Sequence, residues 1–190
     1  MNLFKKNKSV EEENKLRLQK LVDATIVSEV PDGWIKETFA VGGLTEIGFS
    51  KNHSELLLIV SSQGRGVIDC SKLELINRDY NTDHDWMNPH ELWSFGIGKL
   101  SNEKIIVSGL DGGGLPLSNK DGDRLVLMAT KWPIVDLIFQ PNFKSVYTQG
   151  EASKCFRLFH DYELRAYGFS YNGNYFTIAT SSEVHVYRKE

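Results

Sequence analysis

From residue 30 onward the chain alternates between short apolar runs and turn-forming residues, and this alternation limits its fold more than any other feature. The runs are four to six residues long and rich in Ile, Val, Leu, Phe and Tyr, as in 56–60, 104–107 and 175–179. Clusters of Gly, Asn, Asp and Ser separate them. Short runs bounded in this way are typical of strands joined by tight turns. The pattern predicts an all-β domain, with a hairpin turn at Asp121-Gly122.

The N-terminal segment has a different pattern, which predicts a helix. Ser9 followed by Glu12 forms a Ser-x-x-Glu capping box, and acidic residues occupy the first turn, where the helix dipole favours them. Leucines and a valine between 16 and 22 give a modest apolar stripe. We expect one short amphipathic helix and divide the chain into an N-terminal helical segment, 1–28, and a β domain, 29–190.

A repeat is visible within the β region. Gly48–Ser62 and Gly168–Ser182 both begin Gly-Phe-Ser and continue through a polar turn into an apolar strand, and weaker copies begin at Gly96 and Phe139. The unit resembles the blades of WD-repeat and related β-propellers, although the Trp-Asp and Gly-His pairs are absent. We therefore expect a small, degenerate propeller-like assembly of about four antiparallel β-sheets. The sequence leaves open whether the sheets close on themselves.

Composition narrows the function classes. The chain has 190 residues, 41% of them hydrophobic, with 22 Lys and Arg against 25 Asp and Glu and a net charge of −3. This is the composition of a folded protein without the basic face that nucleic-acid binding requires. No run approaches the length of a membrane span, and no apolar stretch follows the basic N-terminus. We expect a cytoplasmic protein with two reduced, buried thiols, Cys70 and Cys155, while a disulfide between them stays open.

No catalytic motif is recognisable. Asp83, His84, Asp85 and His90 offer metal-ligand atoms, but their spacing matches no defined metal-binding loop. The glycine-rich stretch 109–117 lacks the Gly-Lys-Ser/Thr and the following helix of a phosphate-binding loop. We therefore predict no metal, no cofactor, no catalytic residues and no enzymatic activity.

Binding to another protein is the remaining class. The stretch from 79 to 91 contains four acidic residues and no Lys or Arg, with one tryptophan inside it and another just beyond. Aromatic anchors beside charges that steer a partner are typical of protein interfaces. The candidate binding residues are Asp79, Asp83, Asp85, Trp86, Glu91 and Trp93. The alternative is that the tryptophans fill the core and the acidic residues are only solvated.

Three stretches, 33–43, 60–70 and 109–117, resemble a family of small bacterial proteins from polymorphic toxin loci. These are the immunity proteins paired with EndoU-type nuclease toxins of contact-dependent growth inhibition systems, and the resemblance covers most of residues 30–190. It implies a protein that binds its cognate toxin nuclease in the cytoplasm and blocks the active site, without contacting nucleic acid or membrane itself. An RNA-cleaving cleft is basic, so an acidic, aromatic surface suits it. Two other functions stay open: a propeller-like interaction scaffold, and a hydrolase or carbohydrate-active enzyme.

Overall fold

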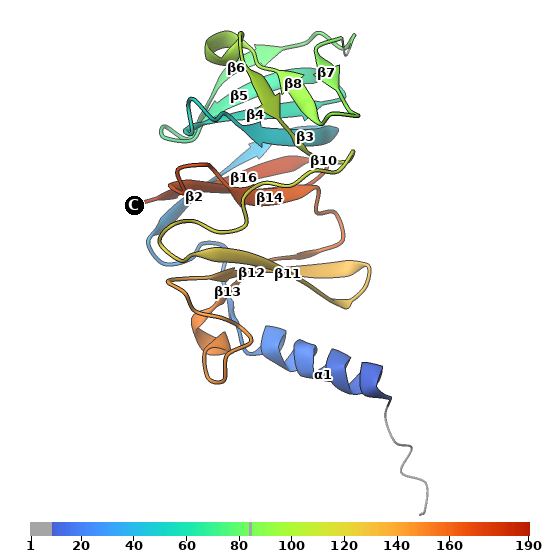
Figure 1. The fold of residues 1–190 in the computed structure, drawn as a ribbon, viewed down its shortest axis with the longest axis vertical. Coiled ribbons are helices and arrows are strands. Elements are labelled where there is room, and N and C mark those ends of the chain that lie inside the picture. Colours follow the sequence, from blue (N-terminus) through green and yellow to red (C-terminus); the bar gives the residue numbers. More distant parts are fainter. Residues whose placement is uncertain (1–8, 84) are drawn as a thin grey trace, which may run out of the picture.

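A computed structural model describes residues 9–83 and 85–190 (Figure 1). It contains four β-sheets and one N-terminal α-helix, which confirms the predicted all-β fold with a helical N-terminus. Two features of the sequence lie outside the described residues: the basic N-terminus, 1–8, and His84, one of the four residues with metal-ligand atoms.

Each sheet is named here by its main strands. The β7–β9 sheet contains β7 (Met87–Asn88), β8 (Trp93–Phe95) and β9 (Lys104–Ile106). The β3–β6 sheet contains β3 (Leu44–Phe49), β4 (Leu56–Ser61), β5 (Gly64–Asp69) and β6 (Glu74–Asp79), with β10 (Ser108–Gly109) beside β3. The β14–β16 sheet contains β14 (Ala166–Phe169), β15 (Tyr175–Ala179) and β16 (Glu183–Lys189), with β2 (Trp34–Ala40) beside β16. The β11–β13 sheet contains β11 (Arg124–Lys131), β12 (Ile134–Gln140) and β13 (Phe156–Asp161), with β1 (Ile26–Val27) beside β13.

The sheets stack face to face in a row, with helix α1 (Val10–Asp23) at one end and the β7–β9 sheet at the other (Figure 1). The β3–β6, β14–β16 and β11–β13 sheets lie between them in that order. One cluster of buried apolar side chains fills each of the four spaces between neighbouring layers. Helix α1 and the β7–β9 sheet lie at opposite ends of the row, so the layers form an open stack and do not close into a ring (Figure 1).

Burial on both faces explains the continuous apolar runs of the sequence. Every residue of β4 is buried. Leu56 and Leu58 contact the β7–β9 layer, whereas Leu57 and Ile59 face the β14–β16 layer. Sheets covered on both sides lack the apolar–polar alternation of a half-exposed strand.

The N-terminal segment is integrated into the β domain. Helix α1 has the predicted capping box at Ser9 and Glu12, and it packs Val22 against the β11–β13 sheet. Strand β1, within the segment we assigned as helical, pairs in parallel with β13, while all other strand pairs are antiparallel.

In three sheets the repeat corresponds to the same strand end, whereas the copy that begins at Phe139 is followed by no strand until β13. Phe49 is followed by Ser50, whose N–H donates to Leu56 O at 3.0 Å, and Phe169 is followed by Ser170, whose N–H donates to Tyr175 O at 2.9 Å. In the β7–β9 sheet the equivalent donor is Gly96, which bonds Glu103 O at 3.0 Å. The structure thus aligns Gly96 with Ser50, two residues away from the alignment with Gly48 that the sequence suggested. Gly96 and Ser50 are equivalent because each makes the same hydrogen bond at the end of its strand. The glycine shared by the two copies in the sequence does not mark equivalent positions.

Candidate protein-binding surface

The outer face of the β7–β9 sheet is the one sheet face at an end of the row that no described helix or sheet covers (Figure 1). Its side chains alternate: Ser94 and Ile105 point into the row and are buried. Those on the other side are solvent-accessible, and Phe95 and Ile106 are 38% and 43% exposed. We call this outer surface the end face; it consists of Trp93, Phe95, Lys104 and Ile106.

The end face is ordered by contacts among its own side chains. The rings of Trp93 and Phe95 meet edge to face, 5.0 Å apart. The Lys104 Nζ lies 4.0 Å from the Trp93 ring centroid. The Trp93 Nε1–H donates to Glu91 Oε2 at 2.6 Å. Edge-to-face aromatic pairs and cation–π contacts each favour one geometry, so these contacts fix the orientation of the Trp93 and Phe95 rings.

Glu91 and Trp93, two of the predicted binding residues, therefore lie together at this surface. Two others, Asp83 and Asp85, are exposed in the loop that leads into β7. The Asp83 N–H donates to Asn81 Oδ1 at 2.8 Å, which shapes the loop locally. Neither carboxylate forms an ion pair with a described residue. Both side chains face solvent.

Asp79 and Trp86 lie below the end face. Trp86 is 5% exposed and packs in the cluster between the β3–β6 and β7–β9 sheets. The Arg65 guanidinium carbon lies 4.4 Å from its ring centroid, and Arg65 Nη2 donates to Asp79 Oδ2 at 2.6 Å. This hydrogen bond lowers the pKa of Asp79 below its ordinary value. For these two residues the structure favours a packing role, with Asp79 holding Arg65 against the tryptophan.

Three residues of the end face, Phe95, Lys104 and Ile106, were not among the residues that the sequence suggested. The useful signal was the two-residue spacing within Trp93-Ser-Phe95 and Lys104-Ile-Ile106. Side chains at that spacing share one face of a strand. The pairing of Trp93 with Ile106 and of Phe95 with Lys104 joins the two strands into one surface.

The structure also bears on the metal ligands, thiols and membrane spans that the sequence analysis considered. Within residues 9–83 and 85–190 no group of three or more His, Cys, Asp or Glu residues could hold a metal ion. Cys70 and Cys155 are both free and buried, which agrees with two reduced thiols. None of the described helices is long and apolar enough to cross a membrane.

Comparison of the chain with protein-family models, with curated proteins and with solved structures finds no match.

Proposed function

We propose that this chain is an immunity protein, which binds a cognate EndoU-type toxin nuclease and blocks the RNA-cleaving site. The end face carries the proposal, because its ordered aromatic and aliphatic groups are solvent-accessible beside the exposed acidic side chains of Asp83 and Asp85. Trp and other aromatic residues dominate the binding energy of protein interfaces, and surrounding charges mainly set the association rate. The resemblance of residues 33–43, 60–70 and 109–117 to immunity proteins of toxin loci is consistent with this role.

The mechanism follows from the arrangement of the two parts. Asp83 and Asp85 in the loop would approach the basic side chains that a nuclease uses to hold RNA phosphates. Trp93, Phe95 and Ile106 would then lose water against the apolar surroundings of that cleft. Charge attraction accelerates such an encounter and falls with added salt, whereas apolar burial slows dissociation. The proposed inhibitor therefore occupies the cleft and performs no chemistry.

The test uses the purified C-terminal domain of the large secreted protein that the resemblance expects to be encoded next to this chain. We expect a one-to-one complex, loss of RNA cleavage in that complex, and an association rate that falls as salt is raised. Absence of binding, or binding that leaves RNA cleavage unchanged, would contradict the proposed function.

Two double variants test the surface. Trp93→Ala with Phe95→Ala should weaken binding by about a hundredfold, on the scale of two interface anchors. Asp83→Lys with Asp85→Lys should mainly slow association and reduce its salt dependence. The matched control is Asp32→Lys with Glu190→Lys, which changes the net charge equally at exposed positions on another layer. Binding that is unaffected by both the Trp93/Phe95 variant and the Asp83/Asp85 variant would place the interface elsewhere.

A further inference from the structure

A second surface lies at the side of the row, where the layer between the β11–β13 and β14–β16 sheets opens to solvent. A hollow of about 370 Å³ lies there. Its walls are mostly apolar and aromatic, and its lining includes Leu127, Trp132, Val135, Tyr162 and Tyr167. It continues the buried cluster that contains Leu125, Leu137 and Phe169. The described residues thus leave one end of this apolar layer unfilled.

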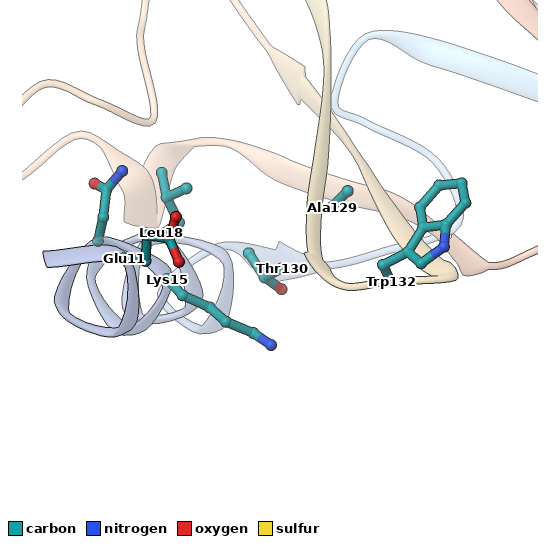
Figure 2. A pocket seen from close by; sticks show the side chains of 7 residues that line it. Glu11, Lys15, Leu18, Ala129, Thr130 and Trp132 are labelled. Atoms are coloured by element: carbon teal, nitrogen blue, oxygen red, sulfur yellow. The ribbon is translucent and has the colours of Figure 1, made fainter. Parts of the chain in front are cut away.

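Trp132 stands at the mouth of this hollow. It lies in the turn between β11 and β12 and is 81% exposed. A second hollow of about 310 Å³ adjoins the same residue and separates it from helix α1. Figure 2 shows Trp132 on the turn, pointing away from the side chains of Glu11, Lys15 and Leu18 on the helix. A tryptophan with open space on both sides has its faces available for contact.

The strand beside the hollow has an open edge. β11 is the last strand of its sheet, and the Leu125 N–H points away from β12, since it donates to Leu117 O at 2.9 Å. Backbone groups in antiparallel strands alternate in direction, so the Leu127 N–H and C=O point the same way. Within the described chain, no backbone hydrogen bond joins residues 126–131 to any segment beyond their own sheet. The backbone N–H and C=O of Tyr167, on the edge strand β14, also point away from their sheet. The Phe169 N–H, two residues later on the same strand, points outward and donates to Pro116 O.

The hollow also has a positive charge in its lining. Arg165 is exposed and is the one charged side chain among the described residues that line the hollow. The nearby Glu163 accepts a hydrogen bond from Ser181 Oγ at 2.9 Å, and Arg165 itself forms no ion pair with a described residue. An acidic group on the ligand would therefore meet an exposed guanidinium.

We propose that this hollow binds an extended peptide segment of a partner protein as an added strand on β11. The Leu127 backbone would supply strand hydrogen bonds, the hollow would receive a large apolar side chain packed on Trp132, and Arg165 would pair with an acidic residue. Strand addition of this kind obtains affinity from the backbone and specificity from side-chain pockets. A second copy of this chain fits poorly. Two antiparallel β11 strands paired about Leu127 would bring residue 129 of one copy to the Leu125 N–H of the other, and Leu117 already accepts a hydrogen bond from that N–H. This surface is independent of the end face and of the proposed toxin partner.

The experiment selects ligands from a phage-displayed library of random linear peptides on the purified full-length protein. We expect enriched peptides that combine an aromatic or aliphatic residue with an acidic one. Their affinity should fall about tenfold or more in Trp132→Ala and in Leu127→Pro, while Leu127→Ala, which keeps the N–H, should lose less. In Arg165→Glu, selection should shift from acidic to basic peptides. Hydrogen exchange at the Leu127 amide should slow on binding.

Phe143→Ala is the matched control, since Phe143 is also 81% exposed but lies at the opposite end of β12. It should bind the selected peptides as tightly as the unmodified protein. The proposal is overturned by failure to enrich any peptide. Peptides that bind Trp132→Ala and Leu127→Pro with undiminished affinity, or that lose affinity equally in Phe143→Ala, would also overturn it.

Discussion

Arg65 connects three parts of the molecule at the scale of a single residue. Its side chain pairs with Asp79 on β6, lies over the Trp86 ring, and donates from Nη1 to Phe95 O at 2.8 Å. Only 8% of the residue is exposed. The guanidinium thus fixes strand β8 to the β3–β6 sheet beneath it. A substitution at Asp79 should therefore lower the free energy of unfolding.

Asp79→Asn should lower the free energy of unfolding at pH 7 by about 1–3 kcal/mol, because a nearly buried guanidinium loses its charged partner. The Asp79 pKa is lowered in the folded protein, so its contribution is present above the ordinary aspartate pKa of about 4 and is lost as the pH falls through the native pKa. Urea unfolding at several pH values should show the two proteins converging in acid. Asp83→Asn, at an exposed position, is the control and should change little. A difference that persists in acid would rule out this ion-pair account.

The two cysteines provide another residue-scale prediction. Burial is the main cause that raises the pKa of both thiols, that of Cys155 to about 11 and that of Cys70 further. A protonated, buried thiol is a poor nucleophile. Neither should react with a thiol reagent at pH 8 in the folded protein, and both should react once it is unfolded in denaturant. Rapid labelling of Cys70 in the native state would contradict the packing described here.

At the scale of elements, the sheets approach so closely at one glycine that no side chain fits. A Cβ on Gly48 would lie 2.3 Å from Ile106 O and 2.8 Å from Ile105 Cγ2, so Ala there must separate β3 from β9. We expect Gly48→Ala to destabilise the protein by about 2 kcal/mol or more, measured by urea unfolding. Gly114→Ala, where a Cβ meets nothing within 4 Å, should be neutral. Equal stability of the two variants would show that the β3–β9 contact is looser than described.

Elements were predictable where local chemistry decides them. The capping box at Ser9 located helix α1, and the two Gly-Phe-Ser copies located the β3–β4 and β14–β15 connections. Short strands such as β1 and β10 had no signal, because two residues carry no periodicity and their pairing depends on distant strands. Trp86 is buried whereas Trp93 is partly exposed, and the local sequence could not distinguish them. The stacking of the layers decides which strand face meets another sheet.

At the scale of the whole molecule, the order of layers differs from the order of the chain. The chain passes from α1 through β1 and β2 to the β3–β6 and β7–β9 sheets and then returns to build the β11–β13 and β14–β16 sheets. The β14–β16 sheet is completed by β2, which pairs with β16 from Ala40–Glu183 to Trp34–Lys189. Such non-local pairing cannot be derived from one sequence, and it explains why the repeat indicated sheets but left their arrangement open.

The same architecture makes the two ends of the row chemically different. Helix α1 covers the outer face of the β11–β13 sheet, with Leu18, Leu21 and Val22 against Met128 and Ile138. The outer face of the β7–β9 sheet has no such cover among the described residues, and it presents aromatic groups to solvent. Contiguous exposed apolar patches are typical of protein interaction sites, and the proposed function uses this face as one.

Growth rescue tests the central claim most directly. The C-terminal domain of the secreted protein that the resemblance expects to be encoded beside this chain would be expressed in cells alone, with this chain, with its Trp93→Ala/Phe95→Ala variant, or with Asp32→Lys/Glu190→Lys. We predict that the domain alone stops growth, that the unmodified chain and the charge control restore it, and that the end-face variant fails at equal expression. Continued growth with the domain alone, or arrest despite abundant unmodified chain, would contradict the proposal that this is an immunity protein.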